Sequence, residues 1–162
     1  MKKKKQIKTS FISHGTVALN RKARFDFDLQ EQIEAGIVLT GNEVKSLRLG
    51  RCSLKESYVK EKNGEIFLTG MHIPAYSVGG FQKIDEYRNR KLLLHKKEIG
   101  KFAGITNVGG KTLVPLKLYF NKRGLAKVII AIGIGKKKHD KRETIKQRDW
   151  NRQKQRLNKL KN

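Results

Sequence analysis

His139 and Asp140 are adjacent near the C-terminal end of the chain, and this pair is the first candidate for chemistry. In a nuclease, His139 would act as a general base, and Lys141 or Arg142 would hold the phosphate. A metal-dependent phosphohydrolase would need further ligands, and the other histidines show no metal-ligand spacing with the pair: His14, His72 and His95. A catalytic group also needs rigid support, which a segment with few apolar residues does not give. We therefore interpret Asp140 as a helix cap and His139 as a ring that stacks or forms hydrogen bonds.

The net charge indicates the kind of partner. The chain has 38 Lys and Arg against 14 Asp and Glu, a formal net charge of +24. So large a charge repels itself in a compact protein unless a polyanion neutralises it. A membrane-binding protein would carry a long basic amphipathic helix with Trp, Phe and Leu along one stripe, and no segment is long or regular enough for this. The composition therefore favours nucleic acid as the partner.

The cysteine content and the apolar runs indicate the compartment. Cys52 is the only cysteine, which excludes an intrachain disulfide and a thiolate metal cage. The N-terminal sequence MKKKKQIKTSFISHG lacks the continuous apolar stretch of a signal peptide, and no run approaches the length of a membrane span. We expect a soluble, cytoplasmic protein that uses no cofactor and no metal.

The charges divide the chain into three parts. Residues 1–24 contain eight basic residues and no acidic residue, and residues 135–162 contain 12 basic and 3 acidic residues. The part between them has 18 basic and 11 acidic residues and most of the apolar content. We predict a basic N-terminal extension at 1–13, a domain that binds nucleic acid at 14–134, and a basic C-terminal tail at 135–162.

The middle part shows the alternation of apolar and polar residues that is typical of short strands. HGTVALN is one such segment, and RFDFDLQ would place Phe25, Phe27 and Leu29 on one face of another. YVKEKNGEIFLTG predicts a hairpin around Asn63-Gly64, a dipeptide that suits a type I′ turn. A second hairpin would turn at 121–124, with these residues sharing a face on each strand: Leu116, Leu118 and Phe120, then Val128, Ile130, Ile132 and Ile134.

Two stretches favour short helices, GNEVKSLRLG at 41–50 and HKKEIGKFAGI at 95–105. Five or six short antiparallel strands with inserted helices are typical of a small Greek-key barrel. We therefore predict a mainly β protein, an OB-fold-like barrel with two or three short flanking helices and a basic C-terminal tail. Such a barrel leaves its loops and one face free to hold nucleic acid.

The tail has the local chemistry of a helix but little surface to bury. Its only sizeable apolar residues are Ile145, Trp150, Leu157 and Leu160, too few to offset the entropy of ordering 28 residues. Asp140 as N-cap and Glu143 three residues later would form a pair like a capping box, and no Gly or Pro follows. We expect this segment to be disordered in the free protein and helical once phosphates neutralise it.

Two further clusters are candidates for RNA contacts. Residues 20–24, NRKAR, follow a predicted strand and could contact phosphates. Glu34 follows this cluster in the sequence and could take part in the same contact. An exposed residue in a turn, with no role in binding, is an equally good interpretation of Glu34. In RNRKLLL, Leu93 lies between two other leucines, of which one or two would belong to the core.

Several blocks of the sequence, in order and spacing, resemble those of the small protein B family, the tmRNA-binding proteins of bacterial trans-translation. The blocks are LNRKARFDF, EAGIVLTGNEVKSLRLG, SYVKEKNGEIFL, RNRKLLLHKKEI, TLVPLKLYF and GKKKHDKRETIKQRDW. The resemblance implies an OB-fold barrel that holds the tRNA-like domain of tmRNA and has no enzymatic activity. By this resemblance, Asn20, Glu34 and Leu93 contact tmRNA, with Arg21, Lys22, Arg90 and Lys91 as phosphate neighbours.

The resemblance also implies a role for the tail. It would become helical on a stalled ribosome, in the decoding centre and the empty mRNA channel. The matching positions are Gly135, Lys136, Lys137, His139, Asp140, Lys141, Arg142, Trp150 and Leu157. The implied partners are tmRNA, the small-subunit RNA of the stalled ribosome, and elongation factor Tu and alanyl-tRNA synthetase in the delivery complex; the protein itself is expected to be a monomer.

Two alternatives remain open at the level of the sequence. A ribosomal or ribosome-assembly protein with a basic tail would associate with ribosomes constantly rather than in step with tmRNA. An RNA-processing enzyme would use His139, and replacing it with Ala would then abolish RNA cleavage.

Overall fold

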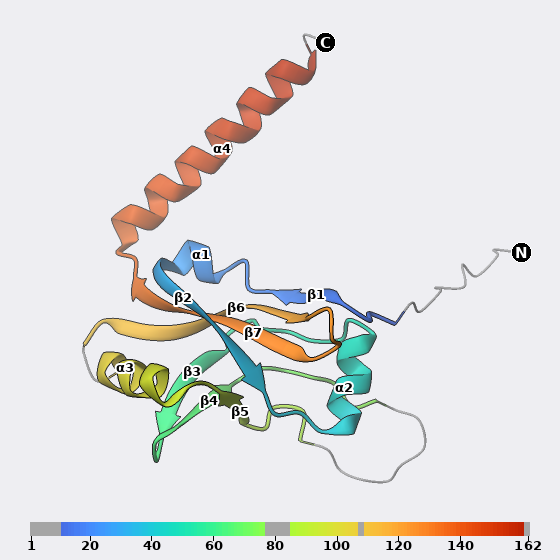
Figure 1. Cartoon of the computed structure of the whole chain (residues 1–162). Helices are drawn as coiled ribbons and strands as arrows, with labels where there is room; N and C mark the ends of the chain where they lie inside the picture. Colours follow the sequence, from blue (N-terminus) through green and yellow to red (C-terminus); the bar gives the residue numbers. More distant parts are fainter. Residues whose placement is uncertain (1–10, 77–84, 107–108, 161–162) are drawn as a thin grey trace, which may run out of the picture.

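The computed structural model describes residues 11–76, 85–106 and 109–160 (Figure 1). The strands are β1 (Gly15–Leu19), β2 (Phe27–Ile37), β3 (Tyr58–Lys62), β4 (Glu65–Thr69), β5 (Arg90–Leu93), β6 (Lys111–Phe120) and β7 (Ala126–Gly135). The helices are α1 (Ala23–Asp26), α2 (Gly41–Arg48), α3 (Lys96–Thr106) and α4 (Lys138–Leu160). The predicted class, mainly β with short helices, is confirmed.

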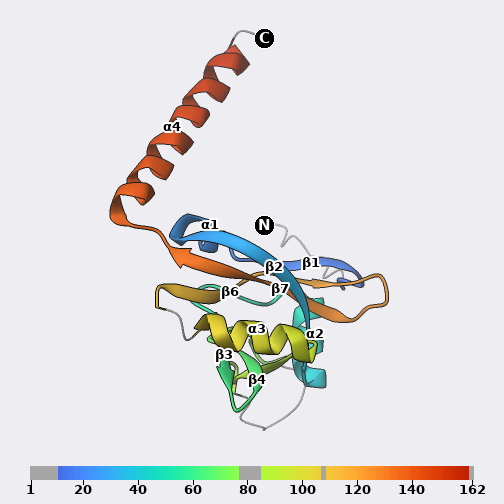
Figure 2. The same ribbon diagram turned by 60° about the vertical axis from the view of Figure 1, so that its left-hand side comes forward.

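The strands form a closed antiparallel barrel. Their order is β1-β6-β3-β4-β5-β2-β7, and β6 also pairs with β7, which closes the sheet on itself. β1 lies outside the closed ring because it pairs with the end of β6, from Gly15 opposite Phe120 to Leu19 opposite Lys117. The result is the small OB-like barrel that the sequence predicts, with α2 and α3 against different sides of it (Figures 1 and 2).

The hairpin between β3 and β4 forms as the sequence predicts. Tyr58 pairs with Thr69 at one end and Lys62 with Glu65 at the other, so the turn consists of two residues. Asn63 has a φ of 54° and Gly64 a φ of 75°. These positive values are the ones a type I′ turn requires, and Asn and Gly adopt them most readily.

The hairpin between β6 and β7 differs from the prediction at one point. The pairing shifts between Pro115 and Lys117, a β-bulge at the residue that cannot donate a backbone hydrogen bond. The bulge separates Leu116 from the next inward-facing residues, so that Leu118 and Phe120 belong to the main core and Leu116 to a second cluster. The prediction that these three residues share one face is therefore wrong for Leu116.

Two apolar clusters stabilise the barrel. The main core fills the interior of the barrel and includes residues from its strands and from α2 and α3. Its members include these almost completely buried residues: Leu47, Ile66, Leu68, Met71, Leu92, Phe102 and Ile130. The second cluster lies where α1 covers the sheet and contains Ala23, Leu116 and Ala131, with Leu29 and Ile129 partly buried against them. α1 is thus held against the outside of the barrel by apolar contacts.

The segment predicted as one strand from residue 24 begins as a helix. α1 ends at Asp26 and β2 begins at Phe27, so Phe25 does not share a strand face with Phe27 and Leu29. β2 then continues to Ile37 through a bulge between Leu29 and Gln32. Glu34 accordingly lies in a strand, and the alternative that placed it in a turn is wrong.

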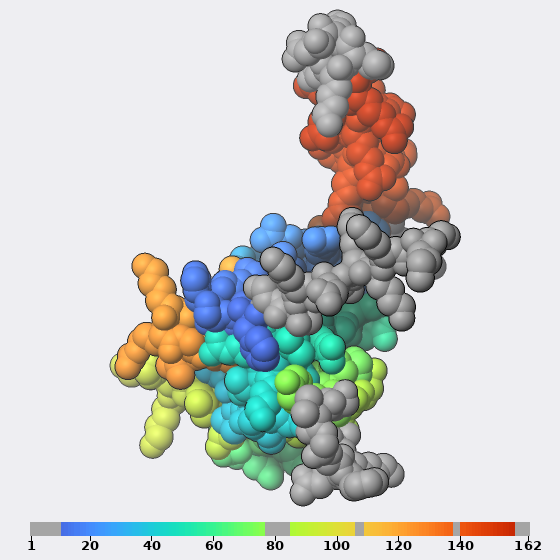
Figure 3. Space-filling model, turned by 90° about the vertical axis from the view of Figure 1, so that its right-hand side faces the viewer, coloured from blue at the N-terminus to red at the C-terminus, as the bar shows by residue number. Residues whose placement is uncertain are grey.

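α4 projects from the barrel as an exposed helix (Figure 3). It begins at Lys138, so Asp140 is its third residue, and the carboxylate of Asp140 accepts a hydrogen bond from the backbone N–H of Lys137 at 3.2 Å. The helix that the local chemistry of the tail predicts is present, whereas its disorder in the free protein stays a prediction. The interpretation of Asp140 as the N-cap is wrong by three positions. Trp150 and Leu157 are 64% and 61% exposed, so neither side chain packs on the barrel.

No helix in the described part of the chain is both long and apolar enough to pass through a membrane.

Candidate nucleic-acid interface

Four strands present one row of residues on the outer face of the barrel. Tyr119 of β6 pairs with Lys127 of β7, Lys127 pairs with Gly36 of β2, and Gly36 pairs with Leu93 of β5. Neighbouring strands in register point paired side chains to the same face. Tyr119, Lys127 and Leu93 therefore lie in line across the sheet, although they come from distant parts of the sequence.

Glu34 lies in the next row and is bound to this one. Its carboxylate accepts a hydrogen bond from the hydroxyl of Tyr119 and forms an ion pair with the Lys127 Nζ at 3.3 Å. The hydrogen bond from Tyr119, and then the hydrogen bond and charge of Lys127, lower the pKa of Glu34 below its ordinary value. The same carboxylate raises the pKa of Tyr119 to about 12. Glu34 is therefore held as an anion in a fixed orientation, with half of its side chain exposed.

Leu93 and Glu34 line the same groove. The groove has a volume of about 640 Å³ and its other walls include Gly36, Lys91 and Lys127. Leu93 is 54% exposed, while its neighbour Leu92 is buried in the core, as expected for alternating residues of a strand. Gly36 permits this arrangement because a side chain there would begin 3.2 Å from the Leu93 Cβ. A groove with an apolar wall, a fixed carboxylate and lysines suits an RNA base and its neighbouring phosphates.

Asn20 fixes the turn between β1 and α1. Its Nδ2 donates to the Pro115 carbonyl at 3.0 Å, and its Oδ1 accepts from the Ala23 backbone N–H at 3.1 Å. Its own backbone N–H donates to the Leu116 carbonyl at 2.8 Å. Asn20 thereby joins the turn to the bulge in β6 and holds the next two residues, Arg21 and Lys22, exposed at the surface.

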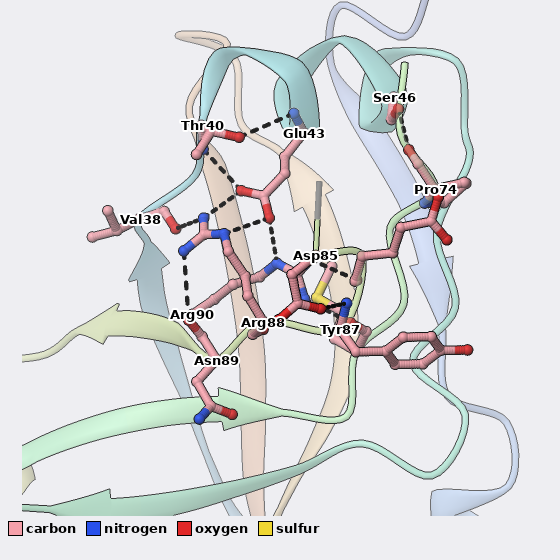
Figure 4. Close-up of polar contacts among 12 residues, drawn as sticks. Val38, Thr40, Glu43, Ser46, Pro74, Asp85, Tyr87, Arg88, Asn89 and Arg90 are labelled. Carbon is pink, nitrogen blue, oxygen red and sulfur yellow. Dashed lines mark hydrogen bonds and ion pairs between the residues drawn. The ribbon is translucent and has the colours of Figure 1, made fainter. Parts of the chain in front are cut away.

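Arg90 is buried in the protein interior, which contradicts its predicted contact with phosphate. Its side chain has 0% exposure, and all three of its nitrogens have partners (Figure 4). Nε donates to Glu43 at 2.8 Å, and the terminal nitrogens donate to backbone carbonyls: those of Met71, Arg88 and Glu86. No nitrogen of Arg90 is therefore available to an external ligand.

Glu43 organises this buried cluster from α2. Its carboxylate binds Arg90 and Arg88 and accepts from the Thr40 backbone N–H at 2.8 Å, completing a capping box at the start of α2 (Figure 4). Burial alone would raise the pKa of Glu43, but these hydrogen bonds and the charge of Arg90 hold the pKa below its ordinary value. The cluster ties α2 to the start of β5 and so positions Lys91 and Leu93.

Lys91 is the partly exposed neighbour of Arg90. It forms an ion pair with Glu65 across the β4–β5 pair, and both side chains are more than 40% exposed. An exposed pair of this kind contributes little to stability and can be exchanged for a phosphate. Of the two basic residues predicted next to Leu93, the structure leaves only Lys91 accessible to RNA.

The base of α4 is attached to α1. The Lys136 backbone N–H donates to the Asp26 carbonyl at 2.9 Å, and the Lys141 Nζ lies 3.0 Å from the Asp26 Oδ1. Gly135 ends β7 opposite Phe27, Lys137 directly precedes α4, and Arg142 is the fifth residue of that helix. His139 belongs to the helix, but its side chain is outside the described part of the structure.

Three residues of the interface were not predicted. Tyr119, Lys127 and Lys117 lie on the outer face, with the Lys117 Nζ 5.0 Å from the centre of the Tyr119 ring. Each lies in a strand where inward-facing apolar residues alternate with outward-facing ones, and it occupies an outward-facing position. This alternation is the sequence pattern that could have predicted their exposure. Their proximity to Glu34 depends on strand pairings that no local pattern reveals.

The described side chains include no group of three or more His, Cys, Asp or Glu residues that could hold a metal ion. Burial raises the pKa of the Cys52 thiol to about 12, which keeps it protonated and unreactive at neutral pH.

Comparison with known proteins gives the family. The family model described as SmpB protein matches residues 17–160, which include β2 to β7, most of β1 and all of α4. The chain belongs to the SmpB family. It is 50% identical to the SsrA-binding protein of Gluconobacter oxydans over 153 residues, which are 94% of this chain and 93% of that protein. It is 54% identical to the SsrA-binding protein of Chelativorans sp. over 142 residues, 88% of this chain and 92% of that protein.

A solved structure shows the same fold in another SmpB-family protein. It is described as "tmRNA-SmpB: a journey to the center of the bacterial ribosome", and its matching chain is 43% identical to this one. The TM-score is 0.64, with 79% of this chain and 93% of that chain covered.

Proposed function

We propose that this chain is an RNA-binding adaptor that binds the tRNA-like domain of tmRNA and brings it to stalled ribosomes. The proposal is supported by relatives named for SsrA binding, which match the chain over nearly all of its length. The single observation that carries it is the outer face of the barrel. There, Glu34 and Leu93 line one groove with Lys91 and Lys127.

In this proposal, the outer face recognises RNA and its margins hold the backbone. The fixed carboxylate of Glu34 accepts hydrogen bonds from base edges or 2′-hydroxyls, and Leu93 packs against a base. Arg21, Lys22 and Lys91 contact phosphates and give the binding its dependence on salt. The side chain of Asn20 forms hydrogen bonds to backbone groups of other residues and so holds the loop that carries Arg21 and Lys22.

α4 would act separately, in the decoding centre and the empty mRNA channel of the ribosome. A helix of 23 residues is about 35 Å long, which suits a narrow passage between RNA walls. The lysines just before it, Lys136 and Lys137, and its own Lys141 and Arg142 would contact phosphates. Trp150 is exposed and able to stack on a base. Because so little of α4 is buried, we expect its helical order to increase when RNA surrounds it.

The remaining partners follow from the family resemblance. Elongation factor Tu and alanyl-tRNA synthetase would act on the same tmRNA in the delivery complex, in the cytoplasm, and the chain would bind as a monomer. No catalytic role is proposed. In a cleavage assay of the purified protein on structured RNA, we expect no turnover that depends on His139, so the unchanged chain and His139→Ala should give the same result.

The test compares two leucine substitutions that add the same charge to exposed positions. Leu93→Asp changes the groove, and Leu157→Asp changes α4; the two side chains are 54% and 61% exposed, so both variants should fold. We expect Leu93→Asp to weaken binding of the isolated tRNA-like domain by about 10- to 100-fold, the loss of one base contact. Leu157→Asp should leave this affinity unchanged and reduce peptide tagging on ribosomes.

Sequencing the RNA that the chain retains in cells separates this role from the alternative. An adaptor should enrich tmRNA over ribosomal RNA, whereas a ribosomal or assembly protein should enrich ribosomal RNA alone. Equal affinity of Leu93→Asp and the unchanged chain for the tRNA-like domain would contradict the assignment of the outer face.

A further inference from the structure

α4 and α1 are joined through three consecutive residues of α1. The Arg24 carbonyl accepts a hydrogen bond from the Lys136 Nζ at 3.2 Å, and Asp26 binds Lys136 through its carbonyl and Lys141 through its carboxylate. Between them, the ring of Phe25 lies 5.3 Å from the guanidinium of Arg148, two to three helical turns along α4. These contacts set the direction in which α4 leaves the barrel (Figure 1).

This direction places Arg148 in a groove that belongs mainly to the barrel. The groove has a volume of about 400 Å³, and four cationic residues line it: Arg21, Arg24, Lys117 and Arg148. Its other walls are neutral: Leu19, Asn20, Gln32, Leu116 and Ile129. The lining contains no carboxylate, and among the described residues none of the four cations forms an ion pair with an acidic side chain.

The lining of this groove contains no acid, unlike that of the groove that contains Glu34 and Leu93. Lys91, Lys101 and Lys127 each have a carboxylate partner: Glu65, Glu31 and Glu34. Asp26 of α1 is already engaged by Lys141 and is not part of the lining. Four like charges around one groove repel each other, and an anion between them relieves the repulsion.

We propose that this groove is a composite phosphate site, in which α4 supplies Arg148 to an RNA backbone held by Arg21, Arg24 and Lys117. The inference rests on the proposed RNA-binding function and adds to it a part of the tail that acts on the same RNA as the barrel. Arg21 belongs to the predicted tmRNA contact, so an RNA chain at that contact continues directly into the groove. Two apolar residues of the lining, Leu116 and Ile129, would contact the sugar edge.

Occupation of the groove would fix the direction of α4. RNA that bridges Arg148 and the barrel cations holds the helix against α1, and the docked helix in turn strengthens RNA binding. The two effects must be equal in free energy because linkage between binding equilibria is reciprocal. Binding of tmRNA to the barrel would therefore orient the tail before it meets the ribosome.

The experiment measures the salt dependence of binding between this chain and the isolated tRNA-like domain of tmRNA. Arg148→Ala is compared with Arg152→Ala, one turn further along α4, exposed and outside the groove lining. We expect Arg148→Ala to reduce the log–log slope by roughly 0.7 to 0.9, the value of one phosphate contact. Over a fourfold change in salt, this is a difference of about threefold in affinity. Arg152→Ala should leave the slope unchanged.

Phe25→Leu provides a second test that keeps every charge. It removes the ring beneath Arg148, so it should weaken binding in the same direction, and the double variant Phe25→Leu/Arg148→Ala should lose no more than Arg148→Ala alone. The distribution of distances between spin labels on α4 and on the barrel should become narrower when this RNA is added. The narrowing should be smaller in Arg148→Ala.

The outcomes separate this inference from the proposed function. If the unchanged chain binds the tRNA-like domain no better than another structured RNA of equal length, the proposed function fails. If it binds specifically but the two arginine variants have the same slope, the composite site alone is overturned. Additive effects of Phe25→Leu and Arg148→Ala would also contradict it.

Discussion

Replacing Glu43 by Gln should destabilise the barrel more than any change at an exposed ion pair. Glu43 is 3% exposed and Arg90 is 0% exposed, and the substitution leaves the Arg90 charge buried without an anion. Breaking a buried pair from one side costs about 3–5 kcal/mol of the free energy of unfolding. Domains of this size have about 5–15 kcal/mol in total, so the loss is a large fraction of the stability.

The matched control is Glu65→Gln, which makes the same chemical change at an exposed pair. Lys91 and Glu65 are 42% and 44% exposed, and such pairs contribute about 0–1 kcal/mol. Urea denaturation monitored by circular dichroism gives both free energies of unfolding. A loss of less than about 1 kcal/mol for Glu43→Gln would refute the argument that the buried cluster stabilises the fold.

The same cluster predicts a dependence of stability on pH. The pKa of Glu43 is lowered in the folded protein from an ordinary value of 4.5. A carboxylate with a lowered folded pKa stabilises the protein above its unfolded pKa, and this stabilisation is lost as pH falls through the folded value. The difference in stability between the unchanged chain and Glu43→Gln should therefore be constant near neutral pH and should shrink below about pH 4.5.

Two other substitutions test the packing of β7 against its neighbouring strands and the charge state of Glu34 on the outer face. Gly133→Ala would place a methyl group 2.8 Å from the Val114 Cγ2 and 3.1 Å from the Phe27 Cβ, so thermal or urea unfolding should show a loss of about 1–3 kcal/mol. Tyr119→Phe removes the hydrogen bond that most lowers the pKa of Glu34, so the pKa should rise toward its ordinary value in a carbon-13 NMR titration. An unchanged pKa would show that Lys127 alone sets the charge state of Glu34.

Local chemistry determined the features that the sequence revealed well. Asn63-Gly64 predicts its turn because only a few residue types adopt positive φ, and the structure places both there. Helical propensity and the lack of Gly and Pro predicted α4, although its first residue differs. The start of β2 was missed because Ala23 packs into the second cluster, a tertiary contact with Leu116 and Ala131 that favours helix over strand.

The roles of individual site residues depended on contacts distant in sequence. Arg90 resembles its basic neighbours in RNRK, and only Glu43, 47 positions away, shows that it is buried. Glu34 was identified as a candidate, but its partners Tyr119 and Lys127 are supplied by strand pairing around the closed barrel. A bulge at Pro115 moved Leu116 to the outer cluster, and a period of two residues cannot anticipate a bulge.

Truncation after Ile134 tests most directly whether the barrel and α4 have separate tasks. The shortened chain keeps the outer face with Glu34 and Leu93 but loses all of α4, including Arg148. We predict that it binds the tRNA-like domain of tmRNA within about tenfold of the full chain, as expected for the loss of one phosphate contact, and supports no tagging on stalled ribosomes. Loss of tmRNA binding on truncation, or normal tagging without α4, would contradict the account.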